Sequence, residues 1–364
     1  MLQLIDVRAR YGRSEVIHGV SVEVPSDGVA AVMGHNGAGK TNLLEALYFG
    51  CVGRSCRTRV DTQVIRFDQP VARVEIEGTG DGERHQLAVA IDRKEGKTFF
   101  ADGAKVESLD PFEWRPPTAV FMPDRLELIK GAPGLRRAHL DALIAALWPA
   151  RRANRRSYAE ALAQRNALLV RGGGQQLEVW DRELARHARA LIADRRMAVA
   201  SIVDRFGEIG SELGLDPAPT LRLRTIADVD PEDEEAYVQA LAARHDDDRR
   251  RGFTTFGPHR DELVIKHGGR EVRTYGSQGQ QRICLLALLL AECEAIAELT
   301  SRQPLILLDD VMSELDATRR GLLVERVAGI GQVLITTTEI EHVPSETPID
   351  AVLSVADGVV SPSA

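Results

Sequence analysis

A phosphate-binding loop is the sequence feature that most constrains the fold of this chain. The apolar run Val29–Met33 is followed directly by Gly34-His35-Asn36-Gly37-Ala38-Gly39-Lys40-Thr41. The run predicts a buried parallel strand, and the residues from Lys40 to about Tyr48 predict a helix. Glycines in such a loop let backbone N–H groups surround a phosphate, and the helix N-terminus faces the same anion. A chance glycine-rich turn would not have this strand and helix on its two sides.

The loop also predicts how the phosphates are held. Lys40 is expected to reach the β- and γ-phosphate oxygens, and the hydroxyl of Thr41 is expected to bind Mg²⁺. The predicted cofactors are therefore ATP and Mg²⁺. The nucleotide contacts predicted here come from Gly34, His35, Asn36, Gly37, Ala38, Gly39, Lys40, Thr41 and Asn42.

A second apolar run, Leu305–Leu308, ends in the acidic pair Asp309-Asp310. The carboxyl ends of strands are where α/β sheets place their ligand chemistry. Asp309 is predicted to hold Mg²⁺ through water, and Asp310 to orient or deprotonate the attacking water. The alternative role for such a pair is a loop or a helix cap.

The segment Ser277-Gln278-Gly279-Gln280 precedes a long apolar helix predicted from Arg282 to about Leu299. Ser277 is placed to cap that helix, and capping alone is the simpler interpretation. Together the hydroxyl, the glycine and the helix N-terminus also form a second cradle for a γ-phosphate. We expect this cradle to serve the nucleotide of a second copy of the chain, so that ATP drives dimerisation.

Several stretches resemble the RecF family of bacterial recombination proteins, which are relatives of the ABC and SMC-type ATPases. The elements Gln164–Asn166 and Gly257–Arg260 separate this family from generic ABC ATPases. The matching stretches are Lys40–Ala46, Gly53–Thr58, Phe121–Asp124, Gly131–Pro133 with Arg136-Arg137, Gln164–Leu169, Gly257–Asp261, Tyr275–Arg282 and Leu307–Asp316.

The resemblance implies an α/β fold: an ABC-type ATPase head with a parallel sheet core and an antiparallel β layer, plus an inserted helical arm domain. The expected divisions are 1–130 for the first part of the head, 131–252 for the arm and 253–364 for the second part of the head. Alternating residues support antiparallel strands over 71–77 and 86–91. Asp102-Gly103 is a candidate hairpin turn, and Gly172–Gly174 is a break between helices of the arm.

The resemblance also implies a function, namely a slow, DNA-stimulated ATPase of recombinational repair. Such a protein binds gapped, double-stranded or single-stranded DNA without sequence specificity, and with RecR and possibly RecO it helps to load RecA at single-strand gaps. Its catalytic residues here would be Lys40, Ser277 and Asp310. Slow hydrolysis is expected because Asp310 is one methylene shorter than the glutamate usual in ABC ATPases.

Three further points follow from the resemblance. Ser313–Asp316 looks like the D-loop, which places Asp316 at the nucleotide interface. The switch histidine of ABC transporters is missing, and Thr336–Thr338 stands in its place as in the RecF family. The stretch Tyr11–Val22 reads more like a transporter ATPase, in which an aromatic such as Tyr11 stacks on adenine.

The sequence is also compatible with two other functions. One is an ATPase subunit of a membrane transporter, and the other is a RecF-like paralogue with another partner. The long separation between Lys40 and Ser277, with a helical arm between them, favours the RecF function over the transporter.

Charge is distributed unevenly along the chain, although the net charge of −8 does not by itself favour nucleic acid. Residues 135–205 contain fourteen arginines, no lysine and seven acids, whereas residues 228–248 contain nine acids and one arginine. This asymmetry predicts a basic and an acidic surface; solvated helix faces and intramolecular ion pairs are the alternatives. The candidate DNA-binding residues are Arg151, Arg152, Arg155, Arg156, Arg54 and Arg57, with Arg59 beside them.

The remaining features predict a cytoplasmic protein. The four cysteines lack paired zinc spacing, and Cys284 and Cys293 are expected to pack in a core. The strand-like start at Leu2 predicts no signal peptide. The most apolar run, 283–291, is too short to span a bilayer, so no membrane association is expected.

Overall fold

The computed structural model describes residues 3–11, 14–23, 28–58, 60–66, 69–80, 82–112, 114–172, 174–226, 229–230, 233–339, 341, 343–344, 349–356 and 359–362. The chain divides into two compact units. The first contains Met1–Leu126, Glu212–Gly214 and Ile296–Ala364, and the second contains Glu127–Ser211 and Leu215–Ala295.

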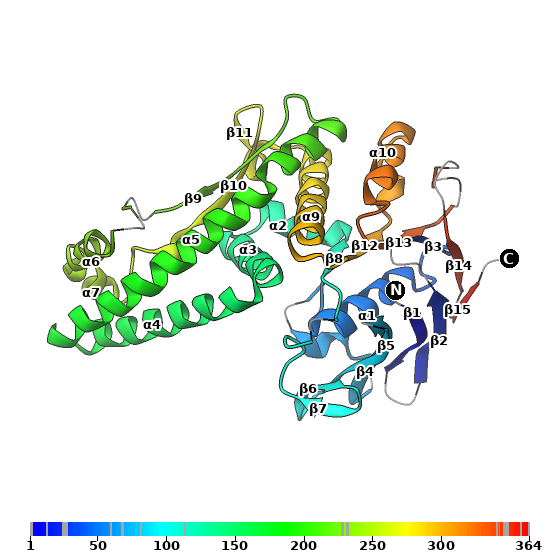
Figure 1. Cartoon of the computed structure of the whole chain (residues 1–364), viewed down its shortest axis with the longest axis horizontal. Helices are drawn as coiled ribbons and strands as arrows, with labels where there is room; N and C mark the ends of the chain where they lie inside the picture. The colour runs from blue at the N-terminus through cyan, green and yellow to red at the C-terminus, as the bar shows by residue number, and fades with distance from the viewer. Residues whose placement is uncertain are drawn as a thin grey trace. The chain divides into compact units, whose positions relative to one another are not determined.

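A mainly parallel six-stranded sheet forms the centre of the first unit (Figure 1). All its strand pairs are parallel except the one between β14 (Ala351–Ala356) and β15 (Val359–Pro362), at one edge of the sheet. The two central strands 305–309 and 332–337 are buried at every residue, and their apolar runs, 305–308 and 333–335, are typical of a sheet covered on both faces. The strand order is β15 (Val359–Pro362), β14 (Ala351–Ala356), β3 (Val29–Met33), β13 (Gln332–Thr337), β12 (Leu305–Asp309) and β8 (Thr118–Phe121).

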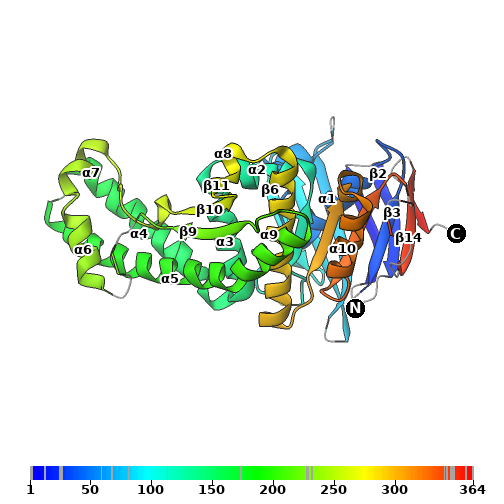
Figure 2. The ribbon, with the colours of Figure 1, turned by 90° about the horizontal axis from the view of Figure 1, so that it is seen from above.

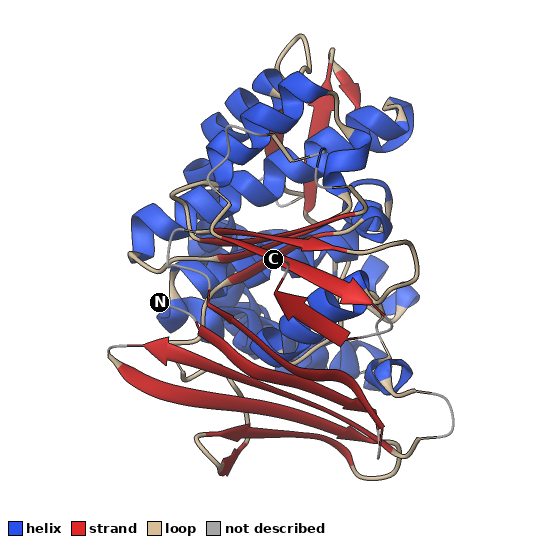
Figure 3. Ribbon diagram, turned by 90° about the vertical axis from the view of Figure 1, so that its right-hand side faces the viewer, coloured by secondary structure: helices blue, strands red, loops and turns tan. Residues whose placement is uncertain are grey.

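An antiparallel sheet forms a second layer of this unit, and Figure 3 shows the two sheets as separate layers. Asp102 and Gly103 both have positive φ, 48° and 79°, which confirms the predicted hairpin turn. The strand order is β2 (Ser14–Glu23), β1 (Gln3–Tyr11), β4 (Val71–Gly80), β5 (Glu83–Asp92), β6 (Gly96–Ala101) and β7 (Ala104–Val106).

Helix α1 (Lys40–Val52) contacts both sheets of the first unit and unites them in one hydrophobic core. Leu44 and Leu47 of α1 are fully buried in this core. Gly50 lets the helix lie close to β4, because a β-carbon at this position would lie 2.9 Å from the Cγ2 of Ile76. The helix that follows the phosphate loop is therefore anchored along its whole length. The first unit also contains η1 (Asp61–Val64), η2 (Pro123–Leu126), η5 (Val311–Glu314) and α10 (Ala317–Val327).

The second unit is mainly helical and contains a small sheet of strand order β11-β10-β9. Figures 1 and 2 both show α4 and α5 lying side by side. Its elements are α2 (Glu127–Lys130), α3 (Pro133–Leu147), η3 (Pro149–Arg151), α4 (Arg152–Arg171), α5 (Gly174–Glu212), β9 (Thr220–Arg224), α6 (Glu234–Ala242), α7 (His245–Arg251), η4 (Pro258–Arg260), β10 (Glu262–His267), β11 (Arg270–Glu271), α8 (Val272–Tyr275) and α9 (Gln278–Thr300). The last residues of α5 and α9 belong to the first unit.

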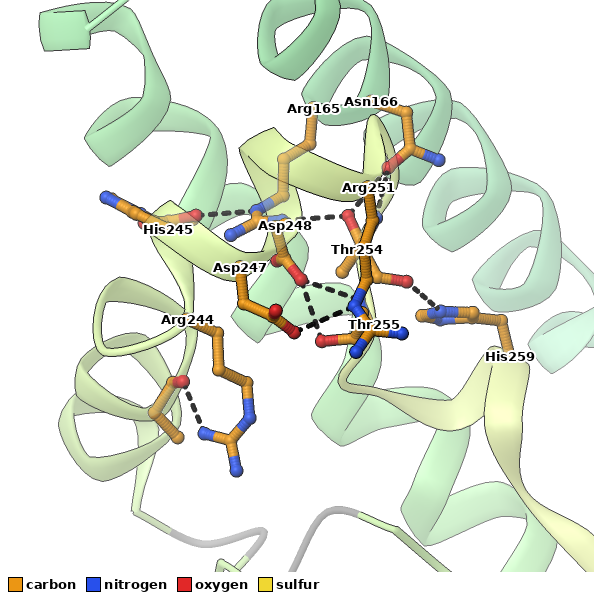
Figure 4. A network of polar contacts seen from close by, with 12 residues as sticks. Arg165, Asn166, Arg244, His245, Asp247, Asp248, Arg251, Thr254, Thr255 and His259 are labelled. Carbon is orange, nitrogen blue, oxygen red and sulfur yellow. Dashed lines mark hydrogen bonds and ion pairs between the residues drawn. The ribbon is translucent and has the colours of Figure 1, made fainter.

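A buried arginine joins the helices of the second unit (Figure 4). The side chain of Arg165 is fully buried and forms ion pairs with Asp181 of α5 at 2.8 Å and with Asp248 of α7 at 2.7 Å. It also donates a hydrogen bond to the hydroxyl of Thr254, and the backbone N–H of Thr254 donates to Asn166. Buried charges persist only when they are paired in this way. The Gln164–Asn166 element therefore holds the arm together.

The Gly257–Arg260 element contributes to the same region. The Nε2 of His259 donates to the carbonyl of Thr254 at 2.9 Å, and its Nδ1 accepts from the hydroxyl of Tyr158 at 2.6 Å. Since a carbonyl only accepts, Nε2 bears a hydrogen, and in the neutral ring Nδ1 is then the acceptor for the hydroxyl of Tyr158. Burial lowers the pKa of His259, which agrees with the neutral form. Both motifs that distinguish the RecF family from generic ABC ATPases therefore have structural contacts within the second unit.

Some predicted boundaries differ from the structure. Helix α1 continues four residues beyond Tyr48, and α9 begins at Gln278 rather than at Arg282. The expectation of a helical arm over 131–252 is wrong at β9, a strand that pairs with β10. The predicted domain boundary at 253 lies inside the second unit, while that at 130 lies near the first break of the chain between units. The three-part division remains a proposal about domains.

Candidate functional site

The phosphate loop connects β3 to α1 as predicted. Gly37 and Gly39 have φ of 84° and 108°, values that residues with a β-carbon rarely adopt. Gly34 lies against β14, where a β-carbon would come within 2.5 Å of the carbonyl oxygen of Val355. No side chain caps the N-terminus of α1. Its backbone N–H groups and the helix dipole therefore remain available for an anion.

Lys40 lies folded over the phosphate loop. Its Nζ donates to the carbonyl of Gly34 at 2.6 Å and to that of His35 at 3.2 Å, and the residue is only 8% exposed. These carbonyls hold the ammonium group inside the curve of the loop. A phosphate bound by the loop would meet this charge without any large movement of the side chain.

Asp309 links the end of β12 to the phosphate loop. Its Oδ2 accepts a hydrogen bond from the hydroxyl of Thr41 at 2.8 Å, and its Oδ1 accepts one from the hydroxyl of Thr336 at 2.8 Å. The residue is 6% exposed. The structure therefore brings together the two residues predicted as Mg²⁺ ligands, which lie 268 positions apart in the sequence.

Asp310 has an unusual backbone for a residue with a side chain, with φ 50° and ψ 26° in the left-handed region. Its N–H donates to the hydroxyl of Thr336 at 3.0 Å, and its carbonyl accepts from Ser313 at 2.8 Å. The Oδ1 of its carboxylate is buried and has no hydrogen-bond partner within the described part of the chain. Left-handed residues of this kind cluster at functional sites. An unpaired carboxylate oxygen is what a catalytic base for water requires.

Asp316 caps helix α10. Its carboxylate accepts from the backbone N–H of Arg319 at 2.9 Å, and its side chain is 57% exposed. Capping therefore gives the carboxylate of Asp316 a structural role, while its exposure leaves it accessible to a second molecule. The predicted nucleotide contact of Asp316 stays a prediction.

The signature segment of the second unit forms a reciprocal cap at the start of α9. The hydroxyl of Ser277 accepts from the N–H of Gln280 at 3.2 Å, and the side-chain carbonyl of Gln280 accepts from the N–H of Ser277 at 2.8 Å. This confirms that Ser277 caps the helix. Ser277, Gln278 and Gly279 are exposed. The hydroxyl of Ser277 accepts in the cap, so its hydrogen remains free to be donated outward.

The donor set beside the phosphate loop suits a divalent cation only when a nucleotide is present. One hydroxyl, from Thr41, and one carboxylate, from Asp309, are too few ligands to hold an ion alone. No group of three or more His, Cys, Asp or Glu residues suited to a metal occurs among the residues that the structure describes. Mg²⁺ is commonly bound by one or two carboxylates together with substrate phosphates. The residues therefore fit Mg²⁺ bound with a triphosphate.

Comparison with known proteins identifies the family of this chain. Residues 17–361 match the RecF/RecN/SMC N terminal domain. The protein named DNA replication and repair protein RecF from Anaeromyxobacter sp. (strain Fw109-5) is 38% identical over 349 residues, covering 93% of this chain and 94% of that protein. Its counterpart in Bacillus subtilis (strain 168) is 33% identical over 332 residues, covering 88% and 89%. The chain belongs to the RecF family.

Solved structures agree with membership of the RecF family. The structure described as the recombination mediator protein RecF-ATP in the RecFOR pathway has a TM-score of 0.83 and 27% identity, covering all of this chain and 98% of that one. An Smc head domain from Pyrococcus furiosus has a TM-score of 0.56 at 17% identity, which shows a shared fold alone. The expected fold class is confirmed, and the RecF chain is an ATPase of the ABC and SMC type.

The arginines predicted to bind DNA differ in how exposed they are and in the ion pairs they form. Arg151 donates to Asp194, whose side chain is 1% exposed. Arg155 lies 3.3 Å from Asp141, which Arg195 also holds. Arg156 is 84% exposed and pairs with the exposed Glu160. Arg152 has an interaction partner, Arg57 lies 3.5 Å from Glu45, and Arg54 is exposed.

The acidic segment compensates part of the positive charge of the arm. Arg165 pairs with Asp248, and Arg189 pairs with Glu234 at 2.7 Å. The two oppositely charged segments therefore contact each other, so a count of arginines overstates the charge available to DNA. DNA binding by the predicted arginines stays a prediction.

The sequence alone did not predict a role for one residue that lies at the nucleotide site. Thr336, which contacts both acidic residues, was noted only for replacing the switch histidine. Its signal was a threonine at the end of a buried strand. The predicted adenine contact of Tyr11 lies outside the described side chains, and Arg59 lies outside the described residues. No helix in the described ranges is both long enough and apolar enough to cross a membrane.

Proposed function

We propose that this RecF chain is a DNA-binding ATPase of recombinational repair in the cytoplasm, in which ATP holds two copies together on DNA. The observation that carries the proposal is the joining of Thr41 to Asp309 beside an uncapped helix N-terminus. This arrangement supports the binding of a triphosphate with Mg²⁺. Thr41 and Asp309 would hold the ion, which would neutralise charge on the phosphates.

The second part of the proposal is that each nucleotide is completed by the partner copy. Ser277 supports this because its hydroxyl hydrogen is free and its segment is exposed. In the closed dimer, Ser277 and the N-terminus of α9 would donate to the γ-phosphate while Lys40 holds the β- and γ-oxygens. Asp310 would orient the attacking water and accept its proton. Slow turnover follows from the short side chain of Asp310, and we propose that DNA stimulates it.

The third part concerns DNA and partner proteins. We propose binding to gapped, double-stranded or single-stranded DNA through phosphate contacts, without sequence readout. RecR and possibly RecO would join the dimer and help to load RecA at single-strand gaps. A solved relative described as a recombination mediator of the RecFOR pathway supports this part. Capture of RecR rather than a permease would distinguish it from a transporter function.

Sedimentation tests the proposal directly. With Mg²⁺ and ATP the chain should sediment as a dimer, without nucleotide as a monomer, and gapped DNA should co-sediment only with the dimer. A chain that binds ATP but remains monomeric would contradict the shared site. A dimer that does not bind DNA at low salt would contradict the proposed function in repair but not the ATPase activity.

Replacing Ser277 with arginine should block this dimerisation while leaving ATP binding by the monomer almost unchanged. The bulky cation would occupy the space of the partner's γ-phosphate, whereas Lys40 and Thr41 belong to the other unit and are untouched. Loss of the cap costs about 1 kcal/mol, which a folded protein tolerates. The measurement is sedimentation with ATP, paired with nucleotide titration.

Ser211→Arg is a matched control for Ser277→Arg, because Ser211 is also an exposed serine of the second unit. It should dimerise like the unmodified chain. If Ser277→Arg still dimerises with ATP, the signature does not serve a partner's nucleotide.

Removing Arg155 and Arg156 together should weaken DNA binding and flatten its salt dependence. Each phosphate contact contributes about −0.9 to the slope of log affinity against log salt, so the slope should change by up to about two units. This pair is preferable to Arg151, because Arg195 continues to hold Asp141 when Arg155 is removed. Loss of Arg151 would instead remove an ion pair of the buried Asp194 and leave it the hydrogen bond from Asn154. Binding should be measured with ATP at several salt concentrations.

Arg182→Ala with Arg186→Ala provides the control, since both arginines are exposed on α5 and the net charge changes equally. Unrelated DNA sequences should lose affinity to the same extent with Arg155 and Arg156 removed. A slope that stays the same would move the DNA surface to Arg54 and Arg57.

A further inference from the structure

A single hydroxyl group connects the two acidic residues of the ATP site. Thr336 is fully buried at the end of β13, the strand that lies between β3 and β12. Its hydroxyl contacts the Oδ1 of Asp309 at 2.8 Å and the backbone nitrogen of Asp310 at 3.0 Å. Since Asp309 also accepts from Thr41, these contacts form a continuous path from the phosphate loop to Asp310.

The direction of each hydrogen bond in this path is determined by the groups that form it. A backbone N–H only donates, so the hydroxyl of Thr336 must accept from Asp310. A carboxylate only accepts, so the same hydroxyl must donate its one hydrogen to Asp309. The register of the parallel strands places Thr336 directly beside Asp309. Only a residue that both donates and accepts can make this pair of contacts.

The second contact matters because of the backbone of Asp310. The residue lies in the left-handed region, which costs free energy for residues other than glycine, although less for Asp and Asn than for most, and is held by its surroundings. The bond from its N–H to Thr336 is one such constraint, and the bond from Ser313 to its carbonyl is another. The backbone conformation sets the direction of the carboxylate, whose Oδ1 is buried and unpaired.

We propose that Thr336 is a positioning residue for ATP hydrolysis. It orients the carboxylate of Asp309 toward Thr41 and fixes the backbone of Asp310, so that the base faces the water that attacks the γ-phosphate. In this role Thr336 acts through its bonds to Asp309 and Asp310. The inference rests on the proposed function of Asp309 and Asp310 and adds the residue that couples them.

A kinetic comparison of three variants tests this role in the full chain, with ATP, Mg²⁺ and DNA present. Thr336→Val keeps the shape and β-branching of the side chain but removes both hydrogen bonds. It should lower kcat by about 10- to 100-fold, the usual effect of losing a residue that orients a metal ligand. KM for ATP should change little, because Lys40 and the loop still bind the phosphates. The Mg²⁺ concentration needed for half-maximal turnover should rise.

Two variants separate positioning from a general structural effect. Thr336→Ser keeps a hydroxyl that can donate and accept, so it should recover most of the turnover. Thr337→Val changes the neighbouring buried threonine, whose hydroxyl donates to the carbonyl of Glu339 and to neither aspartate. It should turn over ATP like the unmodified chain. If Thr336→Val does not fold, Thr336→Ala provides the same loss of both bonds.

Three results would overturn the inference. Thr336→Val could hydrolyse ATP at the normal rate, Thr337→Val could lose as much activity as Thr336→Val, or Thr336→Ser could fail to recover turnover. Each is observed against an active unmodified chain, so the proposed ATPase function would survive. An unmodified chain that binds ATP without ever hydrolysing it would instead overturn the proposed function, and this inference with it.

Discussion

Replacing Lys40 with methionine is expected to abolish ATP binding at ordinary nucleotide concentrations. Methionine has an uncharged side chain of similar length, so the packing of the side chain against the loop is kept while the ammonium group is lost. Charge-assisted hydrogen bonds contribute about 1.5–3 kcal/mol each. Loss of two such bonds to the β- and γ-phosphates corresponds to at least about 3 kcal/mol, or roughly a 100-fold weaker affinity. Titration with a fluorescent ATP analogue measures the change.

The variant also removes two bonds within the loop, from Lys40 to the carbonyls of Gly34 and His35. A thermal melt must therefore accompany the titration, to show that the first unit remains folded. Lys105→Met is the matched control, because Lys105 is an exposed lysine of the same unit. Unimpaired affinity in a folded Lys40→Met protein would contradict the assignment of the phosphate loop.

Replacing Asp310 with asparagine should stop ATP turnover while leaving ATP-dependent dimers intact and long-lived. The amide has the same shape but cannot accept a proton, and general base catalysis contributes about 10²- to 10⁴-fold to a rate. Asparagine is also the residue that tolerates a left-handed backbone as readily as aspartate. The φ of 50° at this position should therefore persist, so the variant tests the carboxylate rather than the turn.

Turnover assays and sedimentation with ATP should be made on the same preparation of Asp310→Asn. Glu325→Gln, an exposed acid of α10 in the same unit, removes one negative charge elsewhere and should behave like the unmodified chain. Turnover that is unaffected by Asp310→Asn would assign the base to another residue. Loss of dimerisation as well would mean that Asp310 contributes to nucleotide binding.

The parts of the fold that were predictable lie in short contiguous patterns. The strand Val29–Met33, the loop after it and the buried strand Leu305–Asp309 follow from apolar runs next to polar chemistry. Asp102-Gly103 indicates its own turn, because few other pairs adopt two positive φ values easily. In each case the physical cause acts within about ten residues, so the sequence contains the whole signal.

The strand β9 was missed for a different reason. Its residues Leu221 and Leu223 point one way and its arginines the other, with Leu221 buried and Arg222 exposed. Five residues of such alternation cannot be told from a short helical stretch, because arginine and leucine are both good helix formers. Only the pairing with β10, about forty residues later, decides the outcome.

The arginines of the arm show the same limit for function. Arg165 and Arg156 lie in one helix and look alike as charges in the sequence. The first is fully buried between Asp181 and Asp248, while the second is 84% exposed. Ion pairs between distant segments decide which charges remain for DNA, and a count along the chain cannot contain that information.

The sequence by itself determined the chemistry of this member of the RecF family: a phosphate loop, an acidic pair after a buried strand and a signature that caps a helix. Each is a set of neighbouring residues whose spacing is dictated by the ligand or by the helix. The tertiary structure alone decided how these groups are coupled. Thr336 lies beside Asp309 because β13 pairs with β12 in a register that brings together residues 27 positions apart. That register results from the packing of the whole buried sheet, which no local pattern of residues specifies.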